Sequence, residues 1–216
     1  MAPKIIMHYF DLPGRAETTR LLLKMGGIEY EEKIIERETW PDVKKTMPFG
    51  QVPVLEVDGK LLAQSSAMER YAAGLAHLLP TDLWALAKHD ELLGFLNEIG
   101  DLLMATYSIQ DPEAKIKARQ DLVAGPIKAK LEKLSSMLEA AGGKFFLGET
   151  ALYVDIAIFK SLSGLTGGTM DGVPTTLLDD YPVLKAFHSR VAALPPIKAF
   201  YEAVTEGPRL AYKPRV

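Results

Sequence analysis

Two short segments of the chain carry residue types suited to binding a small peptide. In Gln51-Val52-Pro53, the proline stands at the start of an apolar run, where it cannot donate to a sheet ladder and leaves nearby backbone groups free for a ligand. Gln64-Ser65 stands at the head of an expected helix, whose free amides attract an anion. Together these segments predict a pocket that reads the backbone and the carboxylates of a small peptide.

Three further side chains could complete such a pocket. Tyr9 follows the first expected strand, and ligands of open α/β sheets collect at the carboxyl ends of strands, where a phenol can donate to a bound anion. Lys44 suits a carboxylate as a point charge, and Trp40 can cover a ligand face and donate through its indole nitrogen. The alternative for Tyr9 is a tyrosine packed at the domain edge, that for Trp40 and Lys44 is an ordinary surface role, and Ser65 also suits an N-cap.

The elements that must position these residues form an α/β pattern up to Leu79. Strands are expected at 4–8, 30–35, 54–57 and 60–62, and helices at 15–25, 40–47 and 65–79. The first strand, helix and second strand predict a parallel pair with a right-handed crossover. Asp58-Gly59, between two apolar runs, is a strong hairpin signal.

Beyond Leu79-Pro80 only helical patterns remain. Helices are expected at 84–107, 113–141, 155–162, 183–193 and 197–205. Gly125-Pro126 should kink the second of these helices, and the third is apolar on nearly every side, so it should be buried and central. A glycine-rich loop is expected over 164–174.

Composition excludes several classes of protein. The chain has 216 residues and a net charge of -3, which argues against a nucleic-acid binder with a basic surface. No apolar run approaches the ~20 residues of a membrane span, and the N-terminus is too short for a signal peptide, so a cytoplasmic protein is expected. Cysteine is absent and the four histidines are dispersed, which predicts no metal site.

The combined motifs resemble the glutathione transferases, and most closely their sigma class. Tyr9–Glu17, Pro48–Leu55 with Asp58-Gly59, and Gln64–Ala67 fall in that family's order and spacing. The similarity covers essentially the whole chain and is most specific in residues 4–79. It implies a thioredoxin-like domain over 1–79, a linker over 80–82 and an all-α domain over 83–216, in a detoxification enzyme whose cosubstrate is glutathione.

The resemblance also implies roles for individual residues. Tyr9 would hydrogen-bond the glutathione sulfur and favour its thiolate, with Arg15 polarising the site. Trp40 and Lys44 are expected to contact the glycyl carboxylate of glutathione. Val52, which precedes a cis Pro53, is expected to contact the cysteinyl part, with Gln51 alongside. Gln64 and Ser65 are expected to contact the γ-glutamyl end.

Relatives are homodimers that complete the glutamyl pocket with an acid from the partner subunit. Alignment puts Glu98 at that position, with Asp101, one turn further on, as its competitor, on a helix face that would line the dimer cleft or else be solvated. Phe49 resembles an aromatic key that inserts into the partner, a core role being its alternative. The electrophile pocket is expected to be lined by Phe10, Leu12, Gly14, Ala105, Tyr107 and Ile109.

Departures from the family pattern set further expectations. The metal-binding aspartate cluster of the vertebrate prostaglandin D synthase branch is replaced by Gly94, Asn97 and Glu98, which predicts no metal. Leu152 stands where a capping Ser or Thr precedes Asp155, so Asp155 must satisfy amides alone or the cap is made differently. The alternatives to conjugation are a glutathione-dependent isomerase, disfavoured because that branch's pocket Trp is absent near Ala105, and a non-enzymatic crystallin-like ligand binder.

Overall fold

The computed structural model describes residues 2–214, and its contacts divide the chain into two compact units. The first unit comprises residues up to 79 together with 195–210, and the second comprises 80–194 together with residues from 211 on. The C-terminal segment 195–210 therefore groups with the N-terminal residues, whereas we expect it from the sequence in the all-α domain.

The first unit is built on a mixed four-stranded sheet in the order β2-β1-β3-β4. Its strands are β1 (Ile5–Tyr9), β2 (Glu31–Ile34), β3 (Val54–Val57) and β4 (Lys60–Ala63). β1 and β2 pair in parallel, as the strand-helix-strand pattern predicts. β3 and β4 form the predicted hairpin, because Asp58 and Gly59 both take the positive φ that a tight two-residue turn requires.

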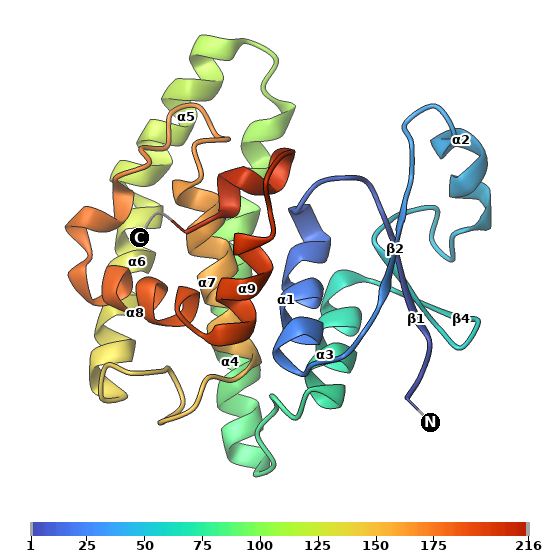
Figure 1. The fold of residues 1–216 in the computed structure, drawn as a ribbon. Helices are drawn as coiled ribbons and strands as arrows, with labels where there is room; N and C mark the ends of the chain where they lie inside the picture. Colours follow the sequence, from blue (N-terminus) through green and yellow to red (C-terminus); the bar gives the residue numbers. More distant parts are fainter. Residues whose placement is uncertain (1, 215–216) are drawn as a thin grey trace. The chain divides into compact units, whose positions relative to one another are not determined.

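The helices of the first unit cover one face of this sheet. α1 (Glu17–Met25) and α3 (Ser65–Leu75) pack against each other on that face, and α9 (Pro195–Glu202) packs against α1 (Figure 1). α2 (Trp40–Val43) and the 3₁₀ turn η2 (Lys44–Thr46) lie away from that face. Because α1 is enclosed in this way, every residue from Glu17 to Leu23 is buried, including its charged ones.

α3 ends four residues before the predicted position. His77 takes a positive φ, its N–H binds the Gly74 carbonyl, and the Leu78 N–H reaches back to Ala73. This pattern of bonds is a Schellman cap. A non-glycine residue in the left-handed conformation thus ends the helix where the sequence carries no glycine to signal it.

The second unit is all helical. It contains α4 (Leu83–Ala105), α5 (Pro112–Ala124), α6 (Pro126–Ala140), α7 (Tyr153–Thr166) and α8 (Pro182–Ala192), with the 3₁₀ turns η3 (Thr106–Ser108) and η4 (Leu177–Asp180). α7 is buried along nearly its whole length, which confirms the prediction of a central apolar helix. Among the described helices, none combines the length and apolar character that crossing a membrane requires.

Two expectations about this unit are corrected by the structure. The interruption expected at Gly125-Pro126 is sharper than a kink: Gly125 leaves the helical conformation, with φ -119° and ψ -100°, so the stretch over 113–141 forms two helices, α5 and α6. The loop expected over 164–174 begins later, because Gly164 lies inside α7. Gly164 stays helical where a larger residue would crowd the chain: a Cβ there would lie 3.0 Å from the Tyr212 hydroxyl.

The start of α7 is held by the carboxylate of Asp155. Its two oxygens accept the backbone N–H groups of Leu152 at 2.8 Å and Phe146 at 2.9 Å. Asp155 therefore satisfies amides alone, one of the two solutions the sequence allows. Burial raises the pKa of Asp155 to about 6, against the opposing effect of these two amide hydrogen bonds.

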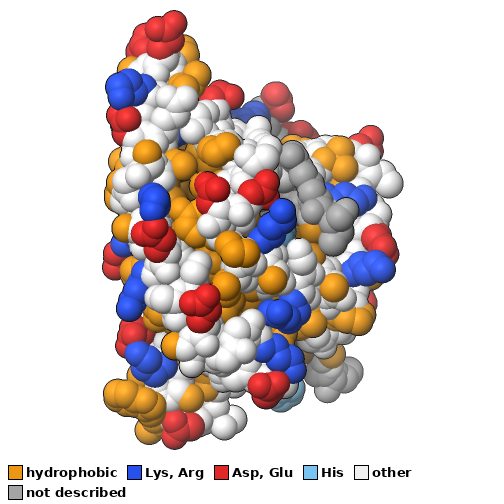
Figure 2. All heavy atoms as spheres, turned by 90° about the vertical axis from the view of Figure 1, so that its left-hand side faces the viewer, with side chains coloured by type: hydrophobic (Ala, Val, Ile, Leu, Met, Phe, Trp, Pro, Cys, Tyr) orange, Lys and Arg blue, Asp and Glu red, His pale blue; other side chains and the backbone are white. Residues whose placement is uncertain are grey.

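The surface carries charges of both signs. Figure 2 shows Lys and Arg side chains lying among Asp and Glu side chains over the face that it draws. This mixture accords with a net charge of only -3.

Candidate active site

The register of the sheet brings three predicted site segments to one edge. His8 of β1 pairs with Val54 of β3, and Val54 pairs with Ala63 of β4, so these residues form one row across the sheet. The residues next to this row, on the same side of it, are Tyr9, Pro53 and Gln64, because β1 and β3 run in opposite directions, as do β3 and β4. Segments more than forty residues apart in the chain therefore end at a common rim.

Tyr9 is held in place by the turn that follows it. Its side chain is 7% exposed, and its hydroxyl oxygen accepts the Arg15 backbone N–H at 3.2 Å. Gly14 has a φ of +43°, and a Cβ at that position would stand 2.5 Å from the Tyr9 hydroxyl. The turn thus needs a glycine beneath the phenol. The contact between Arg15 and Tyr9 runs through the backbone amide, and a role for the Arg15 guanidinium stays a prediction.

An aromatic chain leads from Tyr9 to the predicted glycyl site. The ring of Phe10 lies 5.9 Å from that of Tyr9 and 5.5 Å, edge to face, from that of Trp40. Lys44 belongs to the same rim, because its Cε would lie 3.3 Å from a Cβ added to Gly50, which precedes Gln51. Trp40, Lys44 and the Gln51 segment are thus neighbours of the Tyr9 edge.

The backbone at the predicted cysteinyl and glutamyl sites has free polar groups. The Val52-Pro53 peptide is cis, as predicted, and the ladders begin only at Val54, which leaves the Val52 N–H and C=O outside the sheet. Gln64 has a φ of 72° and makes no side-chain cap to α3, whose first residue is Ser65. The amides at the head of this 11-residue helix are consequently available to an anion.

A buried charge network beneath the turn was missed by the sequence analysis. Arg20 is fully buried; its Nε and Nη2 donate to both oxygens of Glu32 at 2.7 and 3.0 Å, and its Nη1 donates to Glu17 at 3.1 Å. The same Nη1 donates to the carbonyls of Leu12 and Pro13. Burial acts to lower the pKa of Arg20, but the hydrogen bond to Glu32 and the charges of Glu32 and Glu17 together outweigh it, and the pKa is raised. Glu17 and Arg20 have the i, i+3 spacing of a surface ion pair, so the sequence alone gave little signal of this role.

The remaining predicted site residues belong to the second unit. The buried face of α4 carries Leu92, Leu96, Ile99 and Leu103, and the opposite face exposes Glu98 and Asp101, as the helical spacing predicts. Both acids line a mainly apolar cavity of about 660 Å³ together with Ala105 and Ile109. Tyr107 is 54% exposed and lies under the Arg119 guanidinium. An electrophile pocket uniting Ala105, Tyr107 and Ile109 with Phe10, Leu12 and Gly14 stays a prediction.

Glu98 and Asp101 differ in their surroundings. The Glu98 carboxylate is paired with the Lys130 ammonium of α6, whose side chain is only 18% exposed. Asp101, one turn further on, is exposed at the same cavity and enters no ion pair with the described residues. Glu98, which alignment puts at the family position, and its competitor Asp101 therefore differ in their ion pairing.

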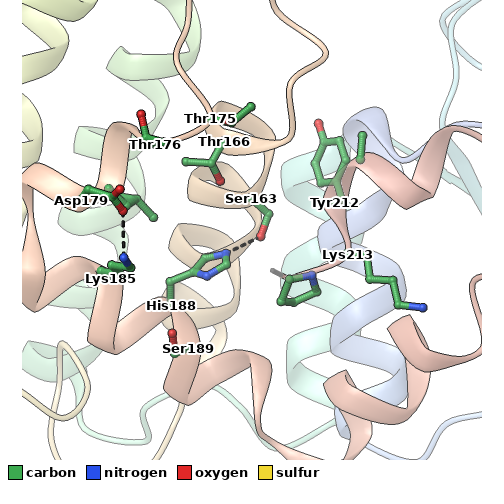
Figure 3. Close-up of a pocket in the computed structure, with 13 residues that line it drawn as sticks. Ser163, Thr166, Thr175, Thr176, Asp179, Lys185, His188, Ser189, Tyr212 and Lys213 are labelled. Carbon is green, nitrogen blue, oxygen red and sulfur yellow. Dashed lines mark hydrogen bonds and ion pairs between the residues drawn. The ribbon is translucent and has the colours of Figure 1, made fainter. Parts of the chain in front are cut away.

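The second unit also holds a polar cavity of about 250 Å³ that contains none of the predicted site residues (Figure 3). His188 and Ser163 point toward each other there, with His188 Nε2 2.8 Å from the Ser163 hydroxyl oxygen, which also lies 2.9 Å from the Phe159 carbonyl. Burial lowers the pKa of His188 to about 4, so the ring is neutral at pH 7. Within residues 2–214 no carboxylate binds the other ring nitrogen, and the pair ties α7 to α8 rather than forming a catalytic triad.

Metal ligation finds no support in the described residues. No group of three or more His, Cys, Asp or Glu side chains among them is placed to hold a metal ion. Of the two acids on α4, Glu98 pairs with Lys130, and both are exposed to solvent. The expectation of a metal-free protein stays a prediction.

Comparisons with known proteins identify the family. Residues 6–74 match the model of the glutathione S-transferase N-terminal domain, and residues 97–203 match that of the C-terminal domain. The chain is 34% identical to a hematopoietic prostaglandin D synthase of Gallus gallus over 93% of its length and 96% of that protein. It is 35% identical to glutathione S-transferase S1 of Drosophila melanogaster over 91% of its length and 77% of that protein.

A solved structure is also similar to this chain. The structure of the prostaglandin synthase D of Nilaparvata lugens superposes with a TM-score of 0.84 at 29% identity, and the match covers 94% of this chain and all of that one (100%). Both domain models, the curated relatives and the fold agree with the thioredoxin-like and all-helical architecture. The chain therefore belongs to the glutathione S-transferase family of enzymes.

Proposed function

We propose that this enzyme, as a sigma-class member of its family, activates glutathione as a thiolate and conjugates it to hydrophobic electrophiles. The observation that carries this proposal is the buried Tyr9 hydroxyl at the carboxyl end of β1, which accepts the Arg15 N–H. Because the Tyr9 oxygen is the acceptor in this hydrogen bond, its O–H hydrogen remains available to donate to a ligand. Accepting the bond also makes the phenol a stronger donor.

The thiolate is the chemical requirement of the reaction. An ordinary cysteine thiol has a pKa of about 8.5 and is mostly protonated at pH 7, so a positioned O–H donor that favours the anion raises the reactive fraction. The sulfur then attacks the electrophilic carbon of an aryl halide, a C–S bond forms, and the halide leaves with the electron pair of the broken bond. Tyr9 holds the sulfur and the remaining rim residues hold the peptide.

The rim suits the three parts of glutathione in order. Lys44 and Trp40 would bind the glycyl carboxylate, and the Val52 N–H and C=O would pair with the cysteinyl backbone in an antiparallel manner. The γ-glutamyl carboxylate would lie at the uncapped head of α3, where Ser65 and the helix amides donate and Gln64 lies alongside.

Titration of bound glutathione tests the role of Tyr9. In Tyr9→Phe we expect the pKa of the bound thiol, followed by thiolate absorbance, to rise by about 1 to 2 units, since each unit corresponds to about 1.4 kcal/mol. Turnover of a generic aryl halide should fall about 10- to 100-fold at pH 6.5 while the KM for glutathione changes little. Tyr71→Phe, on α3, is the matched control. If Tyr9→Phe leaves the titration and turnover unchanged, the mechanism is wrong.

We further propose a homodimer in which Asp101 reaches the glutamyl end of the partner's glutathione. Two features support this. Both acids are exposed, but Glu98 is paired with Lys130, whereas Asp101 enters no ion pair with the described residues. Phe49 is 66% exposed, which rules out a core role within this chain. Asp101→Asn should raise the KM for glutathione about fivefold, as expected for loss of one charge-assisted contact, and Glu98→Gln less than twofold. The reverse ranking, or a monomer by light scattering, would contradict the proposal.

A glutathione-dependent isomerase is the second candidate, because one relative is named a hematopoietic prostaglandin D synthase. Isomerisation needs the same thiolate but a pocket shaped for a lipid endoperoxide, and no tryptophan stands near Ala105. Product analysis with an endoperoxide separates the two: rapid formation of a single isomer with weak aryl-halide conjugation favours the isomerase. Tight binding of hydrophobic dyes with neither activity would instead indicate a non-enzymatic ligand binder.

A further inference from the structure

The C-terminal segment of the first unit contacts the charge network beneath the catalytic turn. The Tyr201 hydroxyl of α9 donates to Glu17 Oε1 at 3.2 Å. Further along, in the 3₁₀ turn η5 (Pro208–Tyr212), Arg209 places Nε 3.7 Å from Glu17 Oε2 and Nη2 3.4 Å from Glu32 Oε1. The segment therefore touches both carboxylates that hold Arg20.

This contact completes the charge balance of the network. Two carboxylates, Glu17 and Glu32, face two guanidiniums, Arg20 and Arg209. The side chains of Glu17 and Arg20 are fully buried, and those of Glu32 and Arg209 are 25% and 21% exposed. Without Arg209, two shielded carboxylates would share one guanidinium, which is costly in a site with little water. Tyr30 is half-buried within electrostatic range of Arg20 and both acids, and desolvation raises its pKa, so it stays a neutral phenol.

The charge balance matters for the turn because Arg20 donates both to the buried carboxylates and to carbonyls of the turn. Its Nη1 donates to Glu17 at 3.1 Å and also to the carbonyls of Leu12 at 3.0 Å and Pro13 at 3.2 Å. Tyr201 donates one hydrogen bond to Glu17, and the Arg209 guanidinium adds a positive charge 3.7 Å from it without a hydrogen bond, so Glu17 depends less on Nη1, which also serves the two carbonyls. These carbonyls directly precede Gly14, the residue beneath the Tyr9 hydroxyl.

A second observation places the same segment against the turn itself. Asp11 and residues 203–209 line one cavity of about 250 Å³ in the first unit. The segment therefore reaches the turn from two directions, through the buried network below it and through the wall of this cavity.

We propose that Arg209 and Tyr201 are positioning residues, through which the C-terminal segment holds the turn from Phe10 to Ala16 and so sets the hydrogen bond of Tyr9 to the glutathione sulfur. The first part of this inference concerns the turn alone. The second part rests on the proposed function, so the two parts are tested separately.

Amide hydrogen exchange of the glutathione-free protein tests the turn. Arg209→Met should accelerate exchange in the peptide covering 10–16 about fivefold, because the Arg15 amide that binds Tyr9 loses its fixed geometry. Lys198→Met removes a charge from exposed α9 surface and should leave that peptide unchanged. Arg209→Lys should restore most of the protection, and Arg209→Met combined with Glu32→Gln should restore part of it by returning the charge balance.

Titration of bound glutathione tests the chemical consequence. Arg209→Met should raise the pKa of the bound thiol by about half a unit and lower kcat at pH 6.5 about threefold, with the KM for glutathione within twofold. Tyr201→Phe should act in the same direction with a smaller effect, and it replaces Arg209→Met if that variant does not fold.

The outcomes separate the two parts. Unchanged exchange over 10–16 in both Arg209→Met and Tyr201→Phe overturns the inference, whatever the activity. Faster exchange with an unchanged thiol pKa overturns the link to the sulfur. If Tyr9→Phe itself leaves the thiol pKa unchanged, the proposed function fails while the exchange result still decides the role of Arg209 at the turn.

Discussion

The two units of this protein bury ionisable groups in different ways. In the first unit, Arg20 and Glu17 are neutralised by charged side chains from β2 and the C-terminal segment, so four side chains from three parts of the chain form one network. In the second unit, the Asp155 carboxylate is satisfied by two backbone N–H groups within nine residues of it.

The difference teaches what each arrangement can control. A local carboxylate cap fixes the start of one helix and contributes to stability. A network assembled from distant segments fixes where those segments stand relative to one another, and here one of them is the turn next to Tyr9. Changes in the network around Arg20 should therefore alter the chemistry at Tyr9. Changes in the Asp155 cap should mainly alter the free energy of unfolding.

The largest expected effect concerns the cap. Asp155→Ala leaves the buried N–H groups of Phe146 and Leu152 without an acceptor, each at a cost of about 1–3 kcal/mol, so the free energy of unfolding should fall by roughly 3 to 5 kcal/mol. Chemical denaturation measures it. The thiol pKa of bound glutathione should not move in the protein that remains folded; a shift as large as that of Arg209→Met would break the distinction between the units.

The next effect is a pH dependence at the same residue. Because the folded-state pKa of Asp155 is raised from 3.8 to about 6, the folded state retains a proton that the unfolded chain has released between these values. The stability contribution of Asp155 is therefore complete below pH 3.8 and is lost as pH rises through 6, by about 3 kcal/mol. Denaturation of wild type and Asp155→Asn at several pH values isolates this component, since the amide does not titrate. Parallel stability curves would show that the carboxyl titrates normally.

The smallest expected effect on stability comes from alanine substitutions at two positive-φ glycines, and at one of them we also expect a loss of activity. Gly14→Ala and Gly27→Ala both place a Cβ on a positive-φ residue, at a cost of about 1–2 kcal/mol for the backbone strain alone. Only at Gly14 does the new Cβ meet Tyr9, 2.5 Å from its hydroxyl, whereas nothing lies within 4 Å at Gly27. Gly14→Ala should lower kcat more than tenfold, and Gly27→Ala should not, in the same conjugation assay. Equal activity in the two variants would show that the turn tolerates displacement of the phenol.

Much of the fold followed from local patterns in the sequence. The hairpin at Asp58-Gly59, the parallel pair β1 and β2, and the buried α7 all depend on turn chemistry or on periodicity over a few residues. The errors occurred where a local signal was weak: His77 ends α3 without a glycine, and Gly164 lies inside α7, with Tyr212 packed where a Cβ would stand. Neither outcome depends on the residue's own propensity.

What the sequence by itself determined was the order of the elements and the residue types at the rim, because these depend on near neighbours in the chain. Only the tertiary structure decided that Glu17 and Arg20 form the centre of a buried network, since burial depends on which segments pack over a helix. Arg209 meets Glu32 across 177 positions of sequence, and Glu98 is distinguished from Asp101 by a lysine on another helix. Such contacts follow from packing between distant segments, and no local pattern encodes them.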